Sequence, residues 1–558
     1  MDAPMDVPVD HPMDVPVDHQ LEKLAVPVLL DRSAAAFGGR TALSFQGRRW
    51  TYAQLAELVE RATDGLQRLG IRPGDRVGLC LPNTPYFVIF YYAALKAGAV
   101  VVNYNPLYVA RELRQQIVDS STTTMIVPDI AAICDKVLGL LPSSGLQRII
   151  VCPFAGVLPP AKRVAFTMLK RKMVAHPAWS HQVIPYRQVV AAGAKPTPVA
   201  IDPGDLAVLQ YTGGTTGLPK GAMLSHANLS LNAQQATYHM PSMRAGQERF
   251  LAVLPFFHVF AMTSIMNGGI LAGAELILHP RFEIAAVMKS LRQDKPTIMH
   301  AVPTIYNAIS LEAERKRIAF PGLRVCVSGG APLPAEVRER FQKLTGCRII
   351  EGYGLTEASP AVASNPPDGE VRPDSVGIVL RGTRVEIRGI DDITRILPPG
   401  ERGEICVRGP QVMQGYLNRE AETRAVFIDG ALRTGDAGHL DADGYLYVTD
   451  RLKDLIICSG YNVYPRVIED ALYEHPAVAE AIVIGIADSY RGQAPLAFVT
   501  LREGHATDGE ALRTFLRDRV SPIELPVRVE IRETLPKTII GKLSRKELVA
   551  EMAALKAT

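Results

Sequence analysis

The segment with the richest chemistry is a loop of glycines, threonines and one lysine, Tyr211-Thr-Gly-Gly-Thr-Thr-Gly-Leu-Pro-Lys-Gly221. Glycine lets backbone N–H groups approach oxygen atoms closely, while hydroxyl groups and Lys220 supply charge-assisted hydrogen bonds. It is not a Walker A loop, because Lys220 is preceded by proline and followed by glycine. The composition predicts a mobile loop that wraps a polyphosphate. Its candidate phosphate contacts are Thr212, Gly213, Gly214, Thr215, Thr216, Gly217 and Lys220.

Five further motifs lie downstream and combine carboxylates, aromatic rings and cations. An aspartate in a turn or a lysine after a glycine would be unremarkable alone, so these motifs carry weight as a set. They are Glu351-Gly-Tyr-Gly-Leu-Thr-Glu357, Leu432-Arg-Thr-Gly-Asp436, Asp450-Arg-Leu-Lys-Asp454, Ser459-Gly-Tyr-Asn-Val-Tyr-Pro465 and Pro536-Lys-Thr-Ile-Ile-Gly-Lys542.

In order and approximate spacing, the loop and these motifs resemble the acyl-adenylate-forming superfamily of acyl-CoA synthetases, peptide-synthetase adenylation domains and firefly luciferase. The resemblance covers about residues 21 to 553. It implies that a carboxylate attacks the α-phosphate of ATP to give acyl-AMP and pyrophosphate, after which the CoA thiol displaces AMP. Because the first step brings two anions together, the site needs a metal ion and cationic help. The resemblance therefore implies ATP, Mg²⁺ and CoA.

The resemblance also implies roles for the nucleotide site. Glu357 and Thr212 would bind Mg²⁺, although a helix cap after Thr356 is a structural alternative for Glu357. Tyr353 would stack on adenine, and Asp436 would accept both ribose hydroxyls. The other expected nucleotide contacts are Arg451, Gly330, Ala331, Gly354, Thr356 and Lys542.

Lys542 is the expected catalytic residue for adenylation. It lies in a Gly-Lys turn before a helix, where its charge would offset the charge that develops as pyrophosphate leaves. We interpret the nearby Lys537, Arg545 and Lys546 as surface charges or phosphate-steering groups. For the second half-reaction, the resemblance implies that a small C-terminal domain rotates about a hinge at Lys453. The loop Ser459, Gly460 and Tyr461 would then face the pantetheine of CoA.

Within the superfamily, residues 101–108 and 254–260 look most like those of bacterial long-chain fatty acyl-CoA synthetases. His258, a candidate catalytic residue, would border the acyl carboxylate together with Phe257 and Phe260. An apolar floor suits an alkyl chain, whose burial is worth about 0.8 kcal/mol per methylene; the alternative is that these side chains merely fill the core. The floor residues are Met262, Ile265, Met266 and Ile270.

Three departures from the family pattern stand out. Ala431 replaces the tryptophan that usually follows Asp-Gly before the ribose motif, and 523–526 lacks the usual tyrosine and basic residue. Met262 stands where some long-chain enzymes have an aromatic gate, which leaves chain length open. Three alternatives therefore remain: a fatty acyl-AMP ligase that loads a carrier protein, an aryl or medium-chain acyl-CoA ligase, and a non-catalytic acyl or nucleotide sensor. Retention of Lys542, Glu357 and Asp436 argues against the sensor.

The elements that must position these residues follow an alternating pattern. Short β-branched runs alternate with amphipathic segments, which predicts βαβ units and largely parallel sheets. At 384–388 and 403–408 a period of two predicts half-exposed antiparallel strands. The predicted fold is α/β, with a large N-terminal domain of α/β subdomains plus a β-rich subdomain, and a small mobile α+β C-terminal domain. The predicted boundaries are a disordered, proline-rich tail over 1–20, an adenylation domain over 21–452 and a C-terminal domain over 453–558.

Composition narrows the class of protein further. Of 558 residues, 47% are hydrophobic and 21% charged, which excludes a wholly disordered chain. The formal net charge of +4 argues against a dedicated nucleic-acid binder. Seven cysteines without a CxxC pair, and an N-terminus without a secretory signal, favour a reducing cytoplasm. The oligomeric state is left open, with a homodimer as one option.

Three segments bear on membranes. The uncharged stretches 77–95 and 250–274 contain prolines and asparagines, so they are expected to form strand-loop-helix core and not spanning helices. Residues 162–173 carry five cations and an apolar side with Val164, Ala165, Met168 and Leu169. Such a segment can lie on an anionic membrane surface. The alternative is a solvated helix whose apolar side meets the core.

Overall fold

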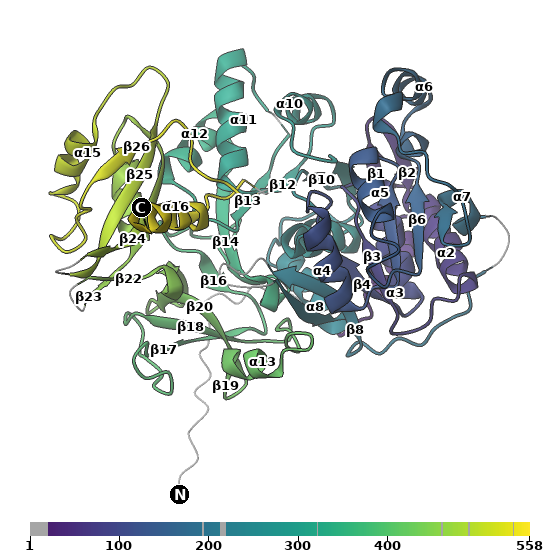
Figure 1. The fold of residues 1–558 in the computed structure, drawn as a ribbon, viewed down its shortest axis with the longest axis horizontal. Coiled ribbons are helices and arrows are strands. Elements are labelled where there is room, and N and C mark those ends of the chain that lie inside the picture. Colours follow the sequence, from purple (N-terminus) through teal and green to yellow (C-terminus); the bar gives the residue numbers. More distant parts are fainter. Residues whose placement is uncertain are drawn as a thin grey trace, which may run out of the picture.

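The computed structural model describes residues 20–191, 195–212, 219–320, 322–458, 461–488, 491–538 and 541–557. Within these ranges the chain forms three β-sheets with helices packed on their faces (Figure 1). Two sheets come from the residues before 452, and the third comes from the residues after 455. This is the α/β fold with a small C-terminal α+β unit that the sequence predicts.

The first sheet has seven strands, and its neighbours are parallel except at the last pair. Its strands are β3 (Arg76–Leu79), β4 (Val100–Asn103), β5 (Thr124–Pro128), β6 (Arg148–Cys152), β7 (Val183–Pro185), β8 (Leu206–Thr212) and β9 (Lys220–Ser225). They are ordered β7-β6-β5-β3-β4-β8-β9. The antiparallel pair β8 and β9 brackets the glycine-rich segment and sets Thr212 opposite Lys220.

The second sheet has fourteen strands. Its strands are β1 (Thr41–Phe45), β2 (Arg48–Thr51), β10 (Arg249–Ala252), β11 (Glu275–Leu278), β12 (Ile298–Ala301), β13 (Val325–Gly329), β14 (Ile349–Gly354), β15 (Ala361–Ser364), β16 (Gly377–Val379), β17 (Arg384–Arg388), β18 (Gly403–Arg408), β19 (Phe427–Ile428), β20 (Ala431–Leu440) and β21 (Tyr445–Arg451). The path runs β17-β18-β20-β21-β16-β15-β14-β13-β12-β10-β11-β1-β2, and β19 pairs with β20. From β14 to β1 the neighbours are parallel, and from β14 to β17 they are antiparallel. The β-rich part is therefore continuous with the parallel part.

The prediction of half-exposed strands at 384–388 and 403–408 is wrong, although their antiparallel pairing is confirmed. Glu386, Arg388 and Glu404 are at most 5% exposed. Arg388 Nη2 lies 2.8 Å from Glu386 Oε2, and Arg408 Nε lies 2.8 Å from Glu386 Oε1. The alternating charged residues are buried because they neutralise one another, as buried charges must.

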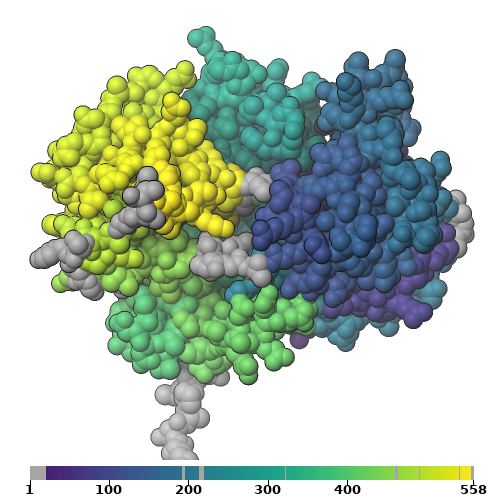
Figure 2. All heavy atoms as spheres, viewed as in Figure 1, coloured from purple at the N-terminus to yellow at the C-terminus, as the bar shows by residue number. Residues whose placement is uncertain are grey.

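The third sheet forms the core of the C-terminal unit. It contains β22 (Ile456–Cys458), β23 (Tyr461–Val463), β24 (Val478–Asp488), β25 (Gly492–Leu501) and β26 (Val529–Ile531), with α14 (Pro465–Tyr473), α15 (Gly509–Leu516) and α16 (Arg545–Ala557). The order is β23-β22-β25-β24, and β26 pairs with β25. In Figure 2 this yellow unit lies against the teal middle of the chain.

Helices and short turns complete the first two sheets. They are α1 (Pro27–Phe37), α2 (Tyr52–Arg68), α3 (Pro85–Lys96), α4 (Ala110–Ser120), α5 (Ala131–Leu138), η1 (Phe154–Val157), α6 (Pro160–Leu169), η2 (Arg171–Met173), α7 (Tyr186–Val189), α8 (His226–Tyr238), the π-helix η3 (Phe260–Asn267), α9 (Gly268–Leu271), α10 (Ile284–Gln293), α11 (Pro303–Lys316), α12 (Ala335–Thr345), η4 (Thr356–Ala358), α13 (Glu420–Val426) and η5 (Leu452–Asp454). In α2, Thr51 and Gln54 form a capping box, and Leu55, Val59, Ala62 and Leu66 form the buried face.

The two uncharged stretches fold as the sequence predicts. Residues 77–95 become β3 and the wholly buried α3, and residues 250–274 become β10, η3 and α9. Among the helices of the described residues, none combines the length and apolar character needed to cross a bilayer.

Helix α6 does not pack its apolar side against the core, which was the alternative to membrane contact. It has no buried residue, and Val164, Met168 and Leu169 are 59%, 75% and 80% exposed. Only Phe166 turns inward, against Phe154, with ring centroids 5.3 Å apart. The helix lies at the edge of the molecule, far from the C-terminal sheet (Figure 1).

Candidate active site

Asp436 on β20 and the partly buried Tyr353 near the end of β14 form a hydrogen-bonded pair. The hydroxyl of Tyr353 donates to Asp436 Oδ2 at 2.6 Å, and Asp436 is 7% exposed. Strand pairing places Arg451 opposite Asp436, with Nε 3.5 Å from Oδ1. Burial raises the pKa of Asp436, while Arg451 and the Tyr353 hydroxyl oppose that shift. The ribose aspartate, the adenine tyrosine and Arg451 of the sequence prediction are thus brought together.

Glu357 lies in η4 and is held by a residue that the sequence does not single out. The hydroxyl of Tyr416 donates to Glu357 Oε1 at 2.7 Å. Backbone hydrogen bonds fix the Tyr416 segment against β9: Met223 N donates to Gly415 O and Leu417 N to Gly221 O, both at 2.9 Å. Tyr416 therefore links the predicted magnesium carboxylate to the strand that follows the glycine-rich loop.

Lys220 contacts the same tyrosine. Its Nζ lies 5.1 Å from the centroid of the Tyr416 ring and pairs with the carboxylate of Glu422. Thr212 lies across the hairpin, where its hydroxyl donates to Lys220 O at 3.5 Å. Tyr416 and Glu422 have no motif in the sequence that marks them. The predicted contacts Gly213, Gly214, Thr215, Thr216 and Gly217 lie outside the described residues.

Lys542 reaches from the C-terminal unit into this site. A Cβ atom on Gly330 would lie 2.7 Å from both Cε and Nζ of Lys542, so a side chain there would displace the ammonium from its present position. Burial lowers the pKa of Lys542 to about 8, with a further contribution from Arg451 and an opposing one from Asp436. Gly330 directly follows β13. Asp436 and Lys542 therefore meet at this glycine. Ala331 comes directly after Gly330, and Gly354 ends β14 beside Tyr353.

A tight turn positions Lys542. Its backbone N–H donates to Thr538 Oγ1 at 3.1 Å, and Thr538 N donates to Lys542 O at 2.7 Å. Gly541 has a φ of 81°, and a Cβ there would lie 2.8 Å from Thr304 Oγ1 on α11. The turn is pressed against the large N-terminal part of the chain.

His258 lies close enough to Lys542 to be affected by its charge. Burial, followed by the charge of Lys542, lowers the pKa of His258 to about 4, so its imidazole is neutral at pH 7. Its Nε2 is buried and lacks a hydrogen-bond partner among the described residues. The Phe257 ring lies 4.7 Å from the His258 ring. A buried, unpaired nitrogen beside an ammonium group suits a polar ligand.

The predicted acyl floor lies on the π-helix η3 and the short α9. Phe260 begins η3, and its ring meets His300 edge-on at a centroid distance of 5.9 Å. Asn103 Nδ2 donates to Met262 Sδ at 3.2 Å. π-Helices occur frequently at functional sites. The floor residues Met262, Ile265, Met266 and Ile270 are all fully buried.

The predicted hinge residue Lys453 lies in η5, between β21 and β22. Burial lowers its pKa, and Arg451 adds to that effect. Of the predicted pantetheine loop, Tyr461 is 66% exposed on β23, while Ser459 and Gly460 lie outside the described residues.

The interpretation of Arg545 as a surface or phosphate-steering charge is wrong. Arg545 lies 2.6 Å from Glu469, 3.1 Å from Asp454 and 3.8 Å from Asp450, and its side chain is 25% exposed. It joins α16 to the hinge segment because three carboxylates attract it inward. Lys537 pairs with Glu480 at 2.6 Å.

Asp436, Tyr353 and Arg451, the C-terminal Lys542 and the buried apolar residues of η3 fit an enzyme that activates carboxylates with ATP. The chain belongs to the AMP-binding enzyme family, whose sequence profile it matches over residues 30–417, with the family's C-terminal domain matched over residues 467–542.

Characterised relatives cover nearly the whole chain. It is 39% identical to a long-chain-fatty-acid–CoA ligase of Bacillus subtilis, over 94% of each chain. It is 38% identical to a ligase of the same name from Salmonella typhimurium, over 93% of each chain. Among solved structures it is similar to the anthranilate CoA ligase AuaEII in complex with anthranoyl-AMP, with a TM-score of 0.84, 26% identity and coverage of 97% and 99%.

Proposed function

We propose that this enzyme is a long-chain fatty acid–CoA ligase, which converts a fatty acid, ATP and CoA into acyl-CoA, AMP and pyrophosphate through an acyl-AMP intermediate. The observation that carries the proposal is the position of Lys542, half-buried against Gly330 and close to Asp436 and His258. The long-chain assignment is supported by the names of the relatives and by the uncharged, buried floor of η3.

In the first half-reaction, the carboxylate of the fatty acid lies between His258 and Lys542. His258 stays neutral and offers Nε2 to a carboxylate oxygen, which avoids placing a second cation beside Lys542. Lys542 carries its charge below about pH 8 and stabilises the negative charge that develops at the α-phosphate. Asp436 and Tyr353 hold the ribose and adenine in place. Arg451, Thr356, Gly354 and Ala331 border the same nucleotide.

The site fits a magnesium ion that enters with ATP. Within the described ranges, no cluster of three or more His, Cys, Asp or Glu side chains could hold a metal ion. Magnesium bound with nucleotides needs only one or two carboxylates, because phosphates and water supply the other ligands. Glu357, oriented by Tyr416, and Thr212 would hold it, and the bound ion would neutralise phosphate charge. Lys220 would contact the outer phosphates.

For the second half-reaction, the C-terminal domain over 453–558 rotates against the domain over 21–452 about Lys453. The rotation would withdraw Lys542 and bring Ser459, Gly460 and Tyr461 to the pantetheine channel. The contacts that this rotation would break include the ion pair of Arg502 with Glu336 on α12 and the packing of Gly541 against Thr304. The exposure of Tyr461 fits a residue that contacts CoA only in the second half-reaction and has no role in adenylation.

Two alternatives concern the substrates. The first alternative is an aryl acid as substrate, which the similarity to the anthranilate CoA ligase AuaEII supports. The second is a carrier protein in place of CoA as the acyl acceptor. A coupled assay of pyrophosphate release and thioester formation with palmitate, octanoate and coumarate, each with and without CoA, separates them. The proposal requires palmitate to be preferred and the thioester to form with free CoA. A preference for coumarate, or acyl-AMP accumulation in the presence of CoA, would contradict it.

The proposed location is the cytoplasmic side of a membrane, with α6 and η2 in contact with anionic lipid. Supporting it are the exposed apolar residues Val164, Met168 and Leu169 and the exposed Trp179. No carboxylate occurs from 136 to 201, whereas lysine and arginine recur there. A homodimer is a further proposal, which light scattering on the purified chain tests.

A further inference from the structure

Two of the seven cysteines lie in sulfur contact. Sγ of Cys347 is 3.4 Å from Sγ of Cys326. All seven cysteines are buried free thiols, and all lie in the described part of the chain. Cys326 is on β13, while Cys347 lies in the short connection from α12 to β14. The proposed ligase reaction uses neither thiol.

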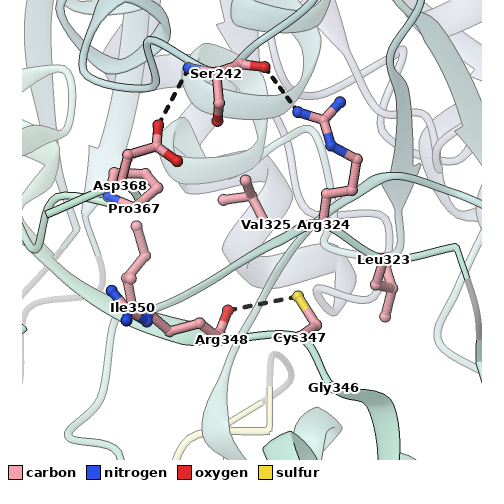
Figure 3. Close-up of a pocket in the computed structure, with 10 residues that line it drawn as sticks. All are labelled: Ser242, Leu323, Arg324, Val325, Gly346, Cys347, Arg348, Ile350, Pro367 and Asp368. Carbon is pink, nitrogen blue, oxygen red and sulfur yellow. Dashed lines mark hydrogen bonds between the residues drawn. The ribbon is translucent and has the colours of Figure 1, made fainter.

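A surface pocket of about 380 Å³ is lined by one of the two cysteines, Cys347, which is 3% exposed (Figure 3). It lies where β13 and β14 begin, at the edge of the sheet opposite to Gly330 and Tyr353. Cys347 lines the pocket, whereas Cys326 is fully buried and is not among the lining residues. A small molecule in the pocket would therefore meet Cys347 first and reach Cys326 only through it.

The charged groups around the pocket are engaged with other parts of the chain. Arg324 Nη1 lies 2.6 Å from Glu248 Oε1, and Arg348 Nη1 donates to Gly369 O at 2.9 Å. Asp368 also lines the pocket, and its Oδ2 accepts from the Ser242 N–H at 3.2 Å (Figure 3). Burial raises the pKa of Cys326, so this thiol is a poor first nucleophile. Cys326 is suited to the second step, attack on an already oxidised sulfur.

We propose that Cys326 and Cys347 form a reversible disulfide when a hydroperoxide enters this pocket. Cys347 attacks the O–O bond of hydrogen peroxide and becomes a sulfenic acid, with release of one water. The Cys326 thiol then attacks that sulfur, expels a second water and closes the S–S bond. Two thiols are oxidised and one peroxide is reduced. A disulfide needs the sulfurs to approach to about 2.05 Å, so the two side chains must move from their present contact.

Peptide mapping tests the proposal on the full-length enzyme. Trypsin places Cys326 in the peptide 325–338 and Cys347 in the peptide 344–348, so each peptide carries one cysteine. The folded enzyme is treated with hydrogen peroxide, alkylated, digested and analysed by mass spectrometry. We expect the two peptides to be linked, with the loss of two hydrogen atoms, and to separate after treatment with dithiothreitol.

Variants establish the order of events. Cys326→Ser should leave Cys347 as a sulfenic acid that dimedone traps, and Cys347→Ser should leave Cys326 reduced. Cys406→Ser, at a buried cysteine on β18, is the matched control and should retain the linked peptide. Far-ultraviolet circular dichroism confirms that each variant is folded. The proposal is overturned if peroxide leaves both thiols reduced, drives Cys347 to sulfonic acid without the link, or links either peptide to another cysteine.

Discussion

At the scale of single residues, the site depends on a missing side chain at Gly330 and on the hydroxyl group of Tyr416. Gly330 has a φ of 78° and no side chain, and the Lys542 ammonium occupies the space that a Cβ would need. Tyr416 performs the complementary task, since its hydroxyl orients the Glu357 carboxylate. Each arrangement leads to a prediction with a matched control elsewhere in the chain.

Gly330→Ala should displace Lys542 and slow acyl-AMP formation about 100-fold, because misplacing a reacting group by about 1 Å costs that much. Gly70→Ala is the control: its φ of 81° imposes the same backbone strain, but nothing lies within 4 Å of the added methyl group. ATP–pyrophosphate exchange measures both variants. Equal rates in the two would show that the close approach to Lys542 is unimportant.

Tyr416→Phe should raise the magnesium concentration needed for half-maximal pyrophosphate release about tenfold. A hydrogen bond to a charged group contributes roughly 1.5–3 kcal/mol, and its loss frees the Glu357 carboxylate to rotate. Tyr447→Phe, on β21, is the control, because its hydroxyl makes only a 3.4 Å contact with Asp441. An unchanged magnesium requirement for Tyr416→Phe would remove Tyr416 from the account.

The sequence predicts the residues that stand in local motifs, but it does not predict those that act through long-range contacts. Lys542, Glu357 and Asp436 stand in compact motifs whose order and spacing resemble those of a known superfamily, and that resemblance implies their roles. Tyr416 and Glu422 act through contacts that form only when β9 pairs with the segment around Tyr416. No local pattern records such a long-range contact, so only the folded structure reveals it.

At the scale of elements, the residue pattern predicts whether a segment is a helix or a strand. It predicts less well whether that segment is buried or exposed. The βαβ pattern of the parallel strands is confirmed. Strands β17 and β18 have the alternating charges of a solvated surface, yet Glu386 and Arg388 are buried as an ion pair. Helix α6 shows the reverse mismatch. Its apolar residues have the pattern of a core-packed face, yet they are exposed.

The exposed α6 and η2 should bind anionic vesicles in a salt-sensitive manner. Each cation near an anionic surface contributes about 1 kcal/mol, so replacing Lys170, Arg171 and Lys172 by glutamine should weaken binding about 100-fold at low salt. Sedimentation with phosphatidylglycerol vesicles at low and high salt measures this effect. Activity on octanoate should be unchanged.

The control for this experiment removes charge from the solvent-facing side of another helix, α10. Lys289→Gln with Arg292→Gln on α10 should leave sedimentation unaffected. If all three proteins sediment alike, or if neutral vesicles bind them equally well, contact of α6 with anionic lipid is refuted.

At the scale of the whole molecule, two units share one site. The C-terminal unit contributes Lys542, while the N-terminal part contributes Gly330, His258 and Asp436. In the proposed mechanism the second half-reaction needs the same space for a thiol, so we expect the unit that holds Lys542 to move. The predicted hinge residue Lys453 lies in η5, which connects the two units.

Lys453→Pro should block this motion, because proline fixes φ near −65°. We expect acyl-AMP formation to persist and thioester formation from supplied acyl-AMP to fall at least about tenfold. Lys453→Ala removes the same side chain without restricting φ, so it should retain both half-reactions. Intact thioester formation in Lys453→Pro would locate the hinge elsewhere.

The central claim is that Lys542 acts in adenylation and is dispensable once acyl-AMP exists. The direct measurement compares Lys542→Ala with the unaltered enzyme in each half-reaction: pyrophosphate release from palmitate and ATP, and palmitoyl-CoA formation from supplied palmitoyl-AMP. Loss of a charge that stabilises the transition state should slow the first at least about 100-fold and leave the second within about twofold, since the ammonium has left the site by then. A similar loss in both half-reactions would contradict the account.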